Sequence, residues 1–93
     1  MNEYKIIANN ESEARRILDA FFALGGYWKH GRKVHQRYQN LDAKYFFYSV
    51  DGTITSTDNF GVSYKGSMKK EITLEDLEKK AGTRQESLIF NTI

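Results

Sequence analysis

Apolar residues recur at steps of three and four between residues 11 and 24, which is the spacing of one face of an α-helix. This face consists of Ala14, Ile17, Leu18, Phe21 and Phe22, and the other face carries mainly Arg15, Arg16 and Asp19. Asn10 fits the N-cap, and Glu13 three residues later completes a pattern like a capping box. Gly25-Gly26 is typical of a helix end. The pattern predicts one amphipathic helix over about residues 11–24.

Short stretches rich in β-branched and aromatic residues predict strands in most of the remaining chain. The strongest runs from Ala43 to Val50, and Thr53 to Thr57 returns beside it after Asp51-Gly52, a dipeptide favoured in type I′ hairpins. Weaker strands are expected at 4–8, 27–28, 33–38, 60–64 and 71–72, with turns at 40–42 and 58–59 and a loop at 65–67.

The C-terminal part of the chain predicts a second, shorter helix. Thr73 fits its N-cap, with Asp76 at the third helical position, and Gly82 ends it. Its apolar side is formed by Leu74, Leu77 and Ala81. Residues 83–93 follow as an edge strand or a flexible tail, and Leu88-Ile89-Phe90 within them is apolar enough to require a docking site or a partner.

The order of the expected elements is β, α, several β and a short α, which is typical of an α+β fold. We expect a small, mostly antiparallel β-sheet packed against one main N-terminal helix, with a short C-terminal helix. A chain of 93 residues is long enough for one domain and too short for two. Residues 1–93 are therefore expected to form a single domain.

Composition narrows the classes of function. The absence of cysteine excludes disulfides, thiolate zinc sites and thiol nucleophiles, and it favours a reducing compartment. The N-terminus has no signal-peptide pattern, and the longest apolar cluster, residues 20–24, is far shorter than the roughly 20 residues of a membrane span. We expect a cytoplasmic protein without membrane contact. The formal charge is only +2, so any binding of nucleic acid depends on local clustering of charge.

One segment, Tyr27 to Tyr38, is basic and aromatic and contains no acid. Lysine and arginine attract phosphates, and exposed tyrosine and tryptophan rings stack on unpaired bases. A second basic cluster, Lys65, Lys69 and Lys70, extends this surface if both lie on the same side of the fold. The candidate RNA-binding residues are Trp28, Lys29, His30, Arg32, Lys33, His35, Arg37, Tyr38, Lys65, Lys69 and Lys70.

Two other interpretations of this segment remain open. In the first, Tyr27 and Trp28 cap the core where the helix meets the sheet, and the basic side chains are solvated or paired with acids such as Glu11, Glu13 or Asp42. In the second, the segment contacts a protein partner with an acidic surface.

Metal binding and catalysis are disfavoured by the same residues. His30 and His35 are five residues apart, which places them on opposite faces of a strand, and no further ligands complete a metal set. The two histidines could in principle act as acid and base in RNA cleavage. Other catalytic templates, including phosphate-binding loops and nucleophile elbows, are absent. We therefore expect no enzyme, no metal and no cofactor.

Several pieces of the sequence, spread over residues 4–81, resemble small early accessory proteins of T4-like bacteriophages. They are Leu24-Gly25-Gly26-Tyr27-Trp28 at the helix end, the basic turn at Gly31, Asp51-Gly52-Thr53-Ile54 after the aromatic strand, and 70–77, Lys-Glu-Ile-Thr-Leu-Glu-Asp-Leu. The resemblance implies a non-enzymatic role in host takeover or in countering host defence, such as antagonism of an RNA-processing toxin–antitoxin system.

These observations lead to one hypothesis with two alternatives. The leading hypothesis is an accessory protein that binds and neutralises a host or defence factor and contacts RNA through the basic aromatic surface. The alternatives are a protein–protein inhibitor of a host enzyme that needs no nucleic acid, and a sponge for a phosphorylated nucleotide signal. A homodimer is compatible with each of them, because a small sheet leaves strand edges open.

Overall fold

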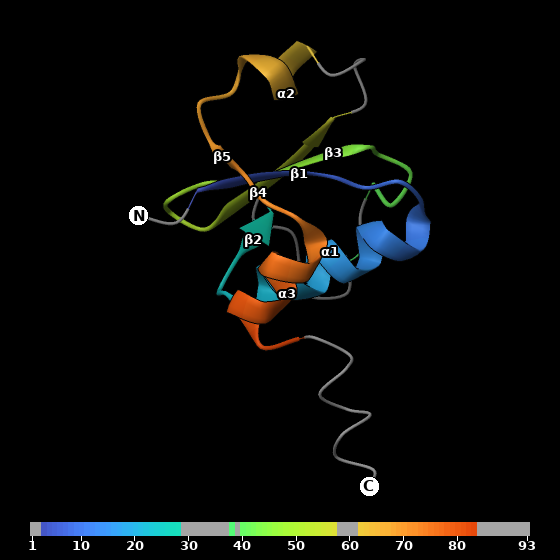
Figure 1. Cartoon of the computed structure of the whole chain (residues 1–93), viewed down its shortest axis with the longest axis vertical. Helices are drawn as coiled ribbons and strands as arrows, with labels where there is room; N and C mark the ends of the chain where they lie inside the picture. The colour runs from blue at the N-terminus through green and yellow to red at the C-terminus, as the bar shows by residue number, and fades with distance from the viewer. Residues whose placement is uncertain (1–2, 29–37, 39, 58–61, 84–93) are drawn as a thin grey trace, which may run out of the picture.

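A five-stranded sheet forms the centre of the structure, a computed structural model that describes residues 3–28, 38, 40–57 and 62–83 (Figure 1). The strands are β1 (Tyr4–Ile7), β2 (Tyr27–Trp28), β3 (Tyr45–Tyr48), β4 (Thr53–Thr57) and β5 (Lys70–Glu71), in the spatial order β2-β4-β3-β1-β5. The long central pairs, β1 with β3 and β3 with β4, are antiparallel, whereas the two short edge strands pair in parallel. The predicted α+β fold with a mostly antiparallel sheet is confirmed.

Helices lie on both faces of the sheet. Figure 1 shows α1 (Glu11–Ala23) and α3 (Leu74–Ala81) on one side and the short α2 (Val62–Gly66) on the other. The alternation of side chains along the strands explains this arrangement. The even-numbered residues Tyr4, Ile6, Phe46, Tyr48 and Ile54 join the α1 residues in one core cluster. The odd-numbered Tyr45 and Phe47 point to the other face, where their rings contact Tyr64 of α2.

Local hydrogen bonds fix the start of α1 as predicted. The Asn10 side chain accepts a hydrogen bond from the Glu13 N–H at 2.8 Å, which satisfies one of the unpaired donors of the first turn. The Glu13 carboxylate accepts from the Asn9 N–H at 3.0 Å, one residue before the N-cap to which a standard capping box returns. The predicted apolar face is buried at Ala14, Ile17, Leu18 and Phe21, with Phe22 partly buried.

The β3–β4 hairpin is confirmed, but the predicted type I′ turn is wrong. Type I′ requires positive φ at both central residues, and only Gly52, with φ of 89°, meets this condition. The Gly52 N–H donates to the Ser49 carbonyl at 2.9 Å, and the Ser49 N–H donates to the Thr53 carbonyl at 2.9 Å. These bonds define a three-residue loop, the type I turn with a glycine bulge. The one extra loop residue keeps the right-handed twist of the hairpin.

The strand predicted at 60–64 is wrong for the residues that the structure describes, because Val62–Gly66 form helix α2. This helix also includes Lys65 and Gly66, which were expected in a loop. β2 and β5 form the edges of the sheet, and residues 62–66 add no strand to it. The helical turn instead places the Tyr64 ring over the open sheet face, 5.3 Å from the ring of Tyr45. Tertiary packing of this aromatic residue overrides the local β-propensity.

The remaining described elements are confirmed, some with changed bounds. β1 ends at Ile7, β3 covers only 45–48 of the predicted 43–50, and β5 covers 70–71 instead of 71–72. The turn at 40–42 is closed by a bond from the Ala43 N–H to the Asn40 carbonyl. The Thr73 hydroxyl accepts from the Asp76 N–H at 3.1 Å and caps α3 as expected. The predicted strand at 33–38 lies outside the described residues except for Tyr38.

Substitution of Gly26 by alanine is expected to lower the free energy of unfolding by about 1–3 kcal/mol, the usual cost of overpacking. A Cβ atom at Gly26 would lie 2.8 Å from the Phe21 carbonyl oxygen and 2.9 Å from the Tyr48 ring. The control is Gly66→Ala in α2, where a Cβ meets nothing within 4 Å and alanine is the better helix former. Urea denaturation measures both variants, and equal stability of the two would contradict the packing described for Gly26.

Candidate functional site

The structure describes only the two ends of the predicted binding segment. Its central candidates lie outside the described residues, namely Lys29, His30, Arg32, Lys33, His35 and Arg37. The ends, Trp28 and Tyr38, are anchored to different parts of the fold.

Trp28 is a core residue. It lies in β2, where it pairs with Ile54 of β4, and only 7% of its surface is exposed. It belongs to the same hydrophobic cluster as Ile54 and Phe21. An indole buried in this way offers no face for a base to stack on, so the predicted stacking role of Trp28 is corrected to a packing role. The exposed ring of β2 is instead that of Tyr27.

Tyr38 is exposed but its ring already has neighbours. The Arg15 guanidinium carbon lies 4.6 Å from the ring centroid, and the Tyr38 hydroxyl donates a hydrogen bond to the Asp19 carboxylate. Both partners belong to the polar side of α1. These contacts give Tyr38 a role in fixing the chain against α1, and they leave less of its ring accessible to a base.

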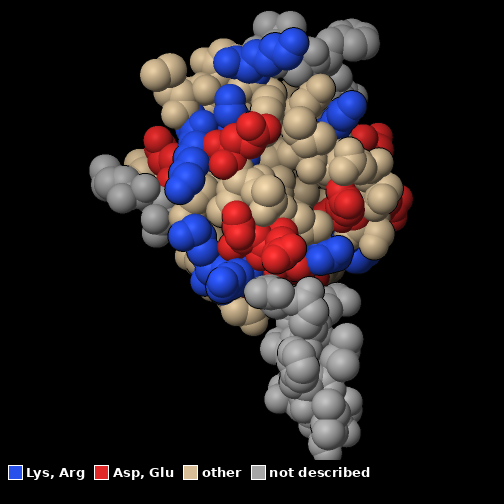
Figure 2. All heavy atoms as spheres, viewed as in Figure 1, with Lys and Arg blue, Asp and Glu red and all other residues tan. Residues whose placement is uncertain are grey.

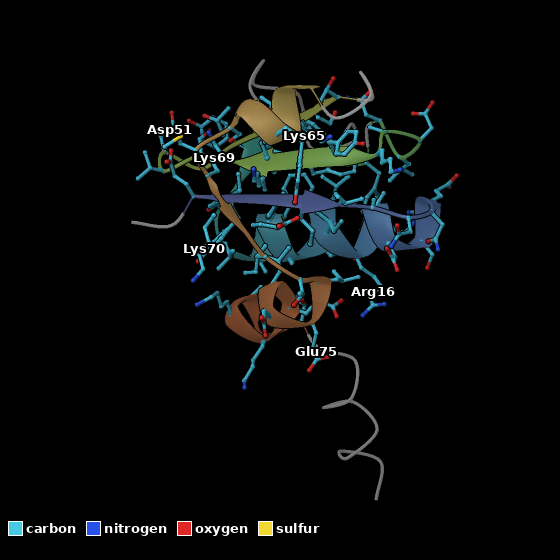
Figure 3. The ribbon with its side chains drawn as sticks, turned by 45° about the horizontal axis from the view of Figure 1, so that its top comes forward. Arg16, Asp51, Lys65, Lys69, Lys70 and Glu75 are labelled. Atoms are coloured by element: carbon cyan, nitrogen blue, oxygen red, sulfur yellow. The ribbon has the colours of Figure 1, made fainter. Side chains whose placement is uncertain are left out.

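Basic side chains gather over β5 and the C-terminal end of α3, on the left of the view in Figure 2, with acidic ones between them. Figure 3 shows Lys65 on α2, and Lys69 and Lys70 at the start of β5. Because β5 and β2 are opposite edges of the sheet, four strand spacings of about 4.8 Å, or about 19 Å, separate Lys70 from Trp28. Lys69 and Lys70 thus do not extend a surface at Trp28, and the described residues form no continuous basic groove.

The structure brings Lys70 together with two lysines that the sequence analysis did not select. Lys70, Lys79 and Lys80 line one hollow of about 580 Å³ between β5 and α3, together with Glu71, Ile72, Thr73 and Asp76. Lys79 and Lys80 lie in the last turn of α3, where the helix dipole favours cations. Their proximity to Lys70 was not predictable, since they follow it by nine and ten positions and the chain changes direction between them. We call Lys69, Lys70, Lys79 and Lys80 the lysine surface.

The acids of the described residues bond mainly to groups other than these lysines. Backbone, amide, hydroxyl or guanidinium donors engage the carboxylates of Glu3, Glu11, Glu13, Asp19, Asp51, Glu71 and Glu78. The ion pairs within 4.0 Å among the described residues are Arg15–Glu11 and Arg16–Glu78. No lysine of the lysine surface therefore forms an ion pair with a described acid, even though Glu75 and Asp76 precede Lys79 and Lys80 by one helical turn.

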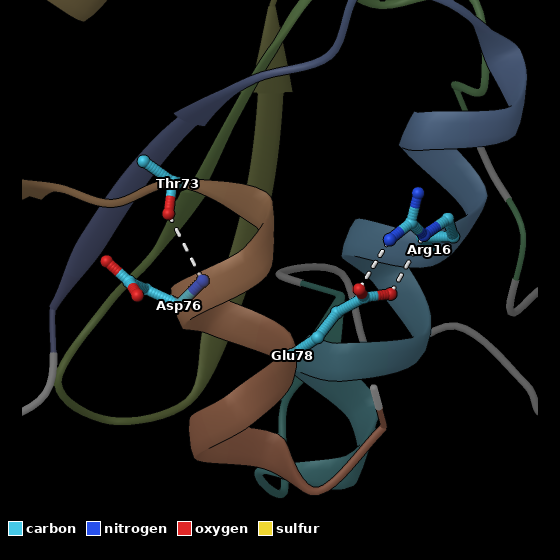
Figure 4. A network of polar contacts seen from close by, with 4 residues as sticks. All are labelled: Arg16, Thr73, Asp76 and Glu78. Carbon is cyan, nitrogen blue, oxygen red and sulfur yellow. Dashed lines mark hydrogen bonds and ion pairs between the residues drawn. The ribbon is translucent and has the colours of Figure 1, made fainter. Parts of the chain in front are cut away.

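A buried ion pair holds α3, and with it two lysines of the surface, against α1. The Arg16 guanidinium donates to both carboxylate oxygens of Glu78, at 2.9 Å through Nε and 2.5 Å through Nη2 (Figure 4). Glu78 is only 3% exposed, whereas the Arg16 side chain remains 40% exposed. Such a bidentate pair fixes geometry as well as charge. Arg16 was predicted on the polar face of α1, and no partner was predicted for Glu78.

Tyr64 and Asp51 are the groups nearest the lysine surface with shifted pKa values. Burial of its ring between α2 and the sheet, followed by the hydrogen bond to the Glu71 carboxylate and the charge of that carboxylate, raises the pKa of Tyr64 above that of free tyrosine. Hydrogen bonds from Thr53 lower the pKa of the exposed Asp51, with a smaller contribution from nearby Lys69. Both shifts have structural causes, a packed aromatic cluster and a turn, and neither marks a catalytic group.

The described residues contain no cluster of three or more histidine, aspartate or glutamate side chains suited to a metal ion. Both histidines of the chain lie outside that part.

No helix in the described ranges is long and apolar enough to cross a membrane. Comparison with protein-family models, with curated proteins and with solved structures finds no match. The resemblance to phage accessory proteins therefore stays a prediction.

Replacing Arg16 by methionine is expected to lower the free energy of unfolding by about 2–3 kcal/mol, because the buried Glu78 carboxylate loses its counter-charge. The double variant Arg16→Met with Glu78→Leu should recover most of this loss, since apolar side chains can replace a buried pair. Denaturant unfolding of the two single variants and the double variant gives the coupling energy. A coupling near zero would mean that the pair does not hold α3 to α1.

Alkaline pH is expected to destabilise the fold through Tyr64. The unfolded chain releases this proton near the ordinary tyrosine pKa of about 10, whereas the folded protein, with its raised pKa, retains it. The stabilisation of the folded state by the raised pKa of Tyr64 is therefore fully present below about pH 10, and it is lost as the pH rises through the pKa of the folded state. Denaturant unfolding with ultraviolet detection of tyrosinate checks this, and Tyr64→Phe should flatten the decline. Tyr48, whose pKa burial also raises, adds to the effect and remains in that variant.

Proposed function

We propose that this protein acts without catalysis, by binding RNA through the lysine surface in the host cytoplasm, and that this binding neutralises a host or defence factor. The observation that carries the proposal is the set of three lysines, Lys70, Lys79 and Lys80, which line one hollow and form no ion pair with a described acid. Ammonium groups that form no ion pair with a described acid attract phosphates.

The same geometry supports recognition of the RNA backbone more than of its bases. Trp28 is buried and Tyr38 is in contact with Arg15, so the described candidates supply no open stacking platform. Lysine binds phosphate as a point charge and carries no base preference. Glu71 and Asp76 share the hollow with the lysines, which limits the number of phosphates that it holds. We therefore expect modest, salt-dependent affinity without strong sequence preference.

The protein-inhibitor and nucleotide-sponge alternatives predict different partners. An inhibitor of a host enzyme retains its partner in a pull-down from lysate treated with nuclease, whereas an RNA-mediated complex is lost. A sponge carries a co-purified nucleotide. Native mass spectrometry detects such a nucleotide and also reports whether the protein is a homodimer.

The double variant Lys79→Ala with Lys80→Ala is expected to weaken binding to a pool of single-stranded RNA of mixed sequence. Each lost phosphate contact reduces the slope of log K against log salt by about 0.7, so two lysines reduce it by about 1.4. Both residues are exposed at the end of α3, and their removal leaves the core intact. Fluorescence anisotropy over a salt series measures affinity and slope together.

Two control variants locate the site. Lys44→Ala removes an exposed lysine that does not line the hollow, and it should leave RNA affinity nearly unchanged. Arg32→Ala with Lys33→Ala removes the same charge as the α3 variant, but from the segment first predicted to bind. If this variant loses RNA affinity and the Lys79→Ala with Lys80→Ala variant does not, the RNA-binding site lies in residues 27–38. Salt-independent binding, or no binding at low salt, would refute the RNA proposal.

A further inference from the structure

One residue of β1 has backbone groups without a strand partner. The Ala8 N–H donates to the Lys44 carbonyl at 2.7 Å, so the even-numbered residues of β1 bond to β3 and the odd-numbered ones face β5. On that side the Lys5 carbonyl accepts from the Ile72 N–H at 3.1 Å. β5 pairs only with Tyr4 and Lys5. Ile7 is the next residue facing this edge, and its N–H and C=O form no backbone hydrogen bond within the described ranges.

A groove lies next to this open edge. It has a volume of about 410 Å³, and Ile7 lines it together with residues from α1, α2, the end of β5 and the start of α3. Its apolar wall is formed by Ile6, Ile7, Tyr64, Ile72 and Leu74. The chain after β5 turns into α3 at Thr73 instead of continuing alongside β1. An unpaired strand edge beside an apolar hollow is the geometry that extended peptides use when they add to a sheet.

The acidic side chains of the groove favour an extended segment that carries a positive charge. Glu13 and Glu71 line it, and no lysine or arginine among the described residues does. One carboxylate oxygen of Glu13 accepts from Asn9, and one of Glu71 accepts from Tyr64, but neither acid forms an ion pair in the described part of the chain. Lys5, the nearest cation on β1, directs its Nζ to the carbonyls of Tyr64 and Ser67 instead.

We propose that this groove, which we call the β1-edge groove, docks an extended segment of a partner protein. The segment pairs with the N–H and C=O of Ile7 as an added strand. Because successive side chains of a strand alternate between the two faces of a sheet, it presents lysine or arginine at two neighbouring positions, one to Glu13 on the α1 face and one to Glu71 on the α2 face. The groove adjoins the lysine hollow, and the two share Glu71, Ile72 and Thr73 at their border. None of the three lysines of the hollow lines the groove, so different side chains distinguish the two proposed sites.

The test uses isotope-labelled full-length protein and a short probe peptide of alternating threonine and valine with two adjacent lysines at its centre, one for each face of the sheet. We expect the peptide to shift the amide resonance of Ile7 and to slow its hydrogen exchange. The same peptide with two central glutamates should bind more weakly. Glu13→Gln and Glu71→Gln should each weaken binding of the lysine peptide about threefold, the effect of one exposed ion pair. Glutamine retains the hydrogen-bonding capacity of each site.

The control variant is Glu11→Gln, which removes the same charge from the first turn of α1 but outside the groove, and it should leave peptide binding unchanged. No effect of the lysine peptide at Ile7, or equal binding of both peptides, would overturn the proposal. Protection of the Ile7 amide before peptide is added would also overturn it. In that case native mass spectrometry shows whether a second copy covers the edge, in a dimer, or a segment of the same chain, in a monomer.

Discussion

The ion pair between Arg16 and Glu78 is the constraint on which the arrangement of the C-terminal half depends. α3 has only eight residues and one fully buried apolar side chain, Leu77, so its apolar face alone is a small contribution to packing. The guanidinium fixes both oxygens of a carboxylate that is almost completely buried, and this fixes the position of α3 on α1. The position of α3 in turn decides where β5 leaves the sheet and where Lys79 and Lys80 lie.

The short length of β5 gives the structure two hollows with different chemistry. On one side β5 and the end of α3 bring three lysines together. On the other side β1 continues past its partner, and the partly buried Ile7 lines a groove with two glutamates. A longer β5 would close the second hollow by pairing with Ile7. Both candidate surfaces therefore follow from one feature, the early turn from a parallel edge strand into a capped helix at Thr73.

The acidic and basic side chains of this chain differ in how they are bonded, although the net charge is low. Turns, caps and one buried pair engage many of the carboxylates, as at Asp51, Glu13 and Glu78. The side chains of the lysine surface form no ion pair with the acids of the described residues. A formal charge of +2 is thus compatible with a surface that attracts anions, because lysines that cluster locally raise the potential at that surface.

Local sequence patterns were enough to predict the periodic face of α1, the caps at Asn10 and Thr73, the β3–β4 hairpin and the α+β order. They did not predict α2, where packing of Tyr64 outweighed strand propensity. They also did not predict the burial of Trp28, because an aromatic residue in a short strand gives the same pattern whether its ring faces the core or solvent.

Three further features became visible only in the folded chain. They are the proximity of Lys70 to Lys79 and Lys80, the Arg16–Glu78 pair, and the strand edge at Ile7. The first two bring together residues that are distant in sequence, and the third depends on where β5 ends. No local propensity encodes which side chains meet across the fold.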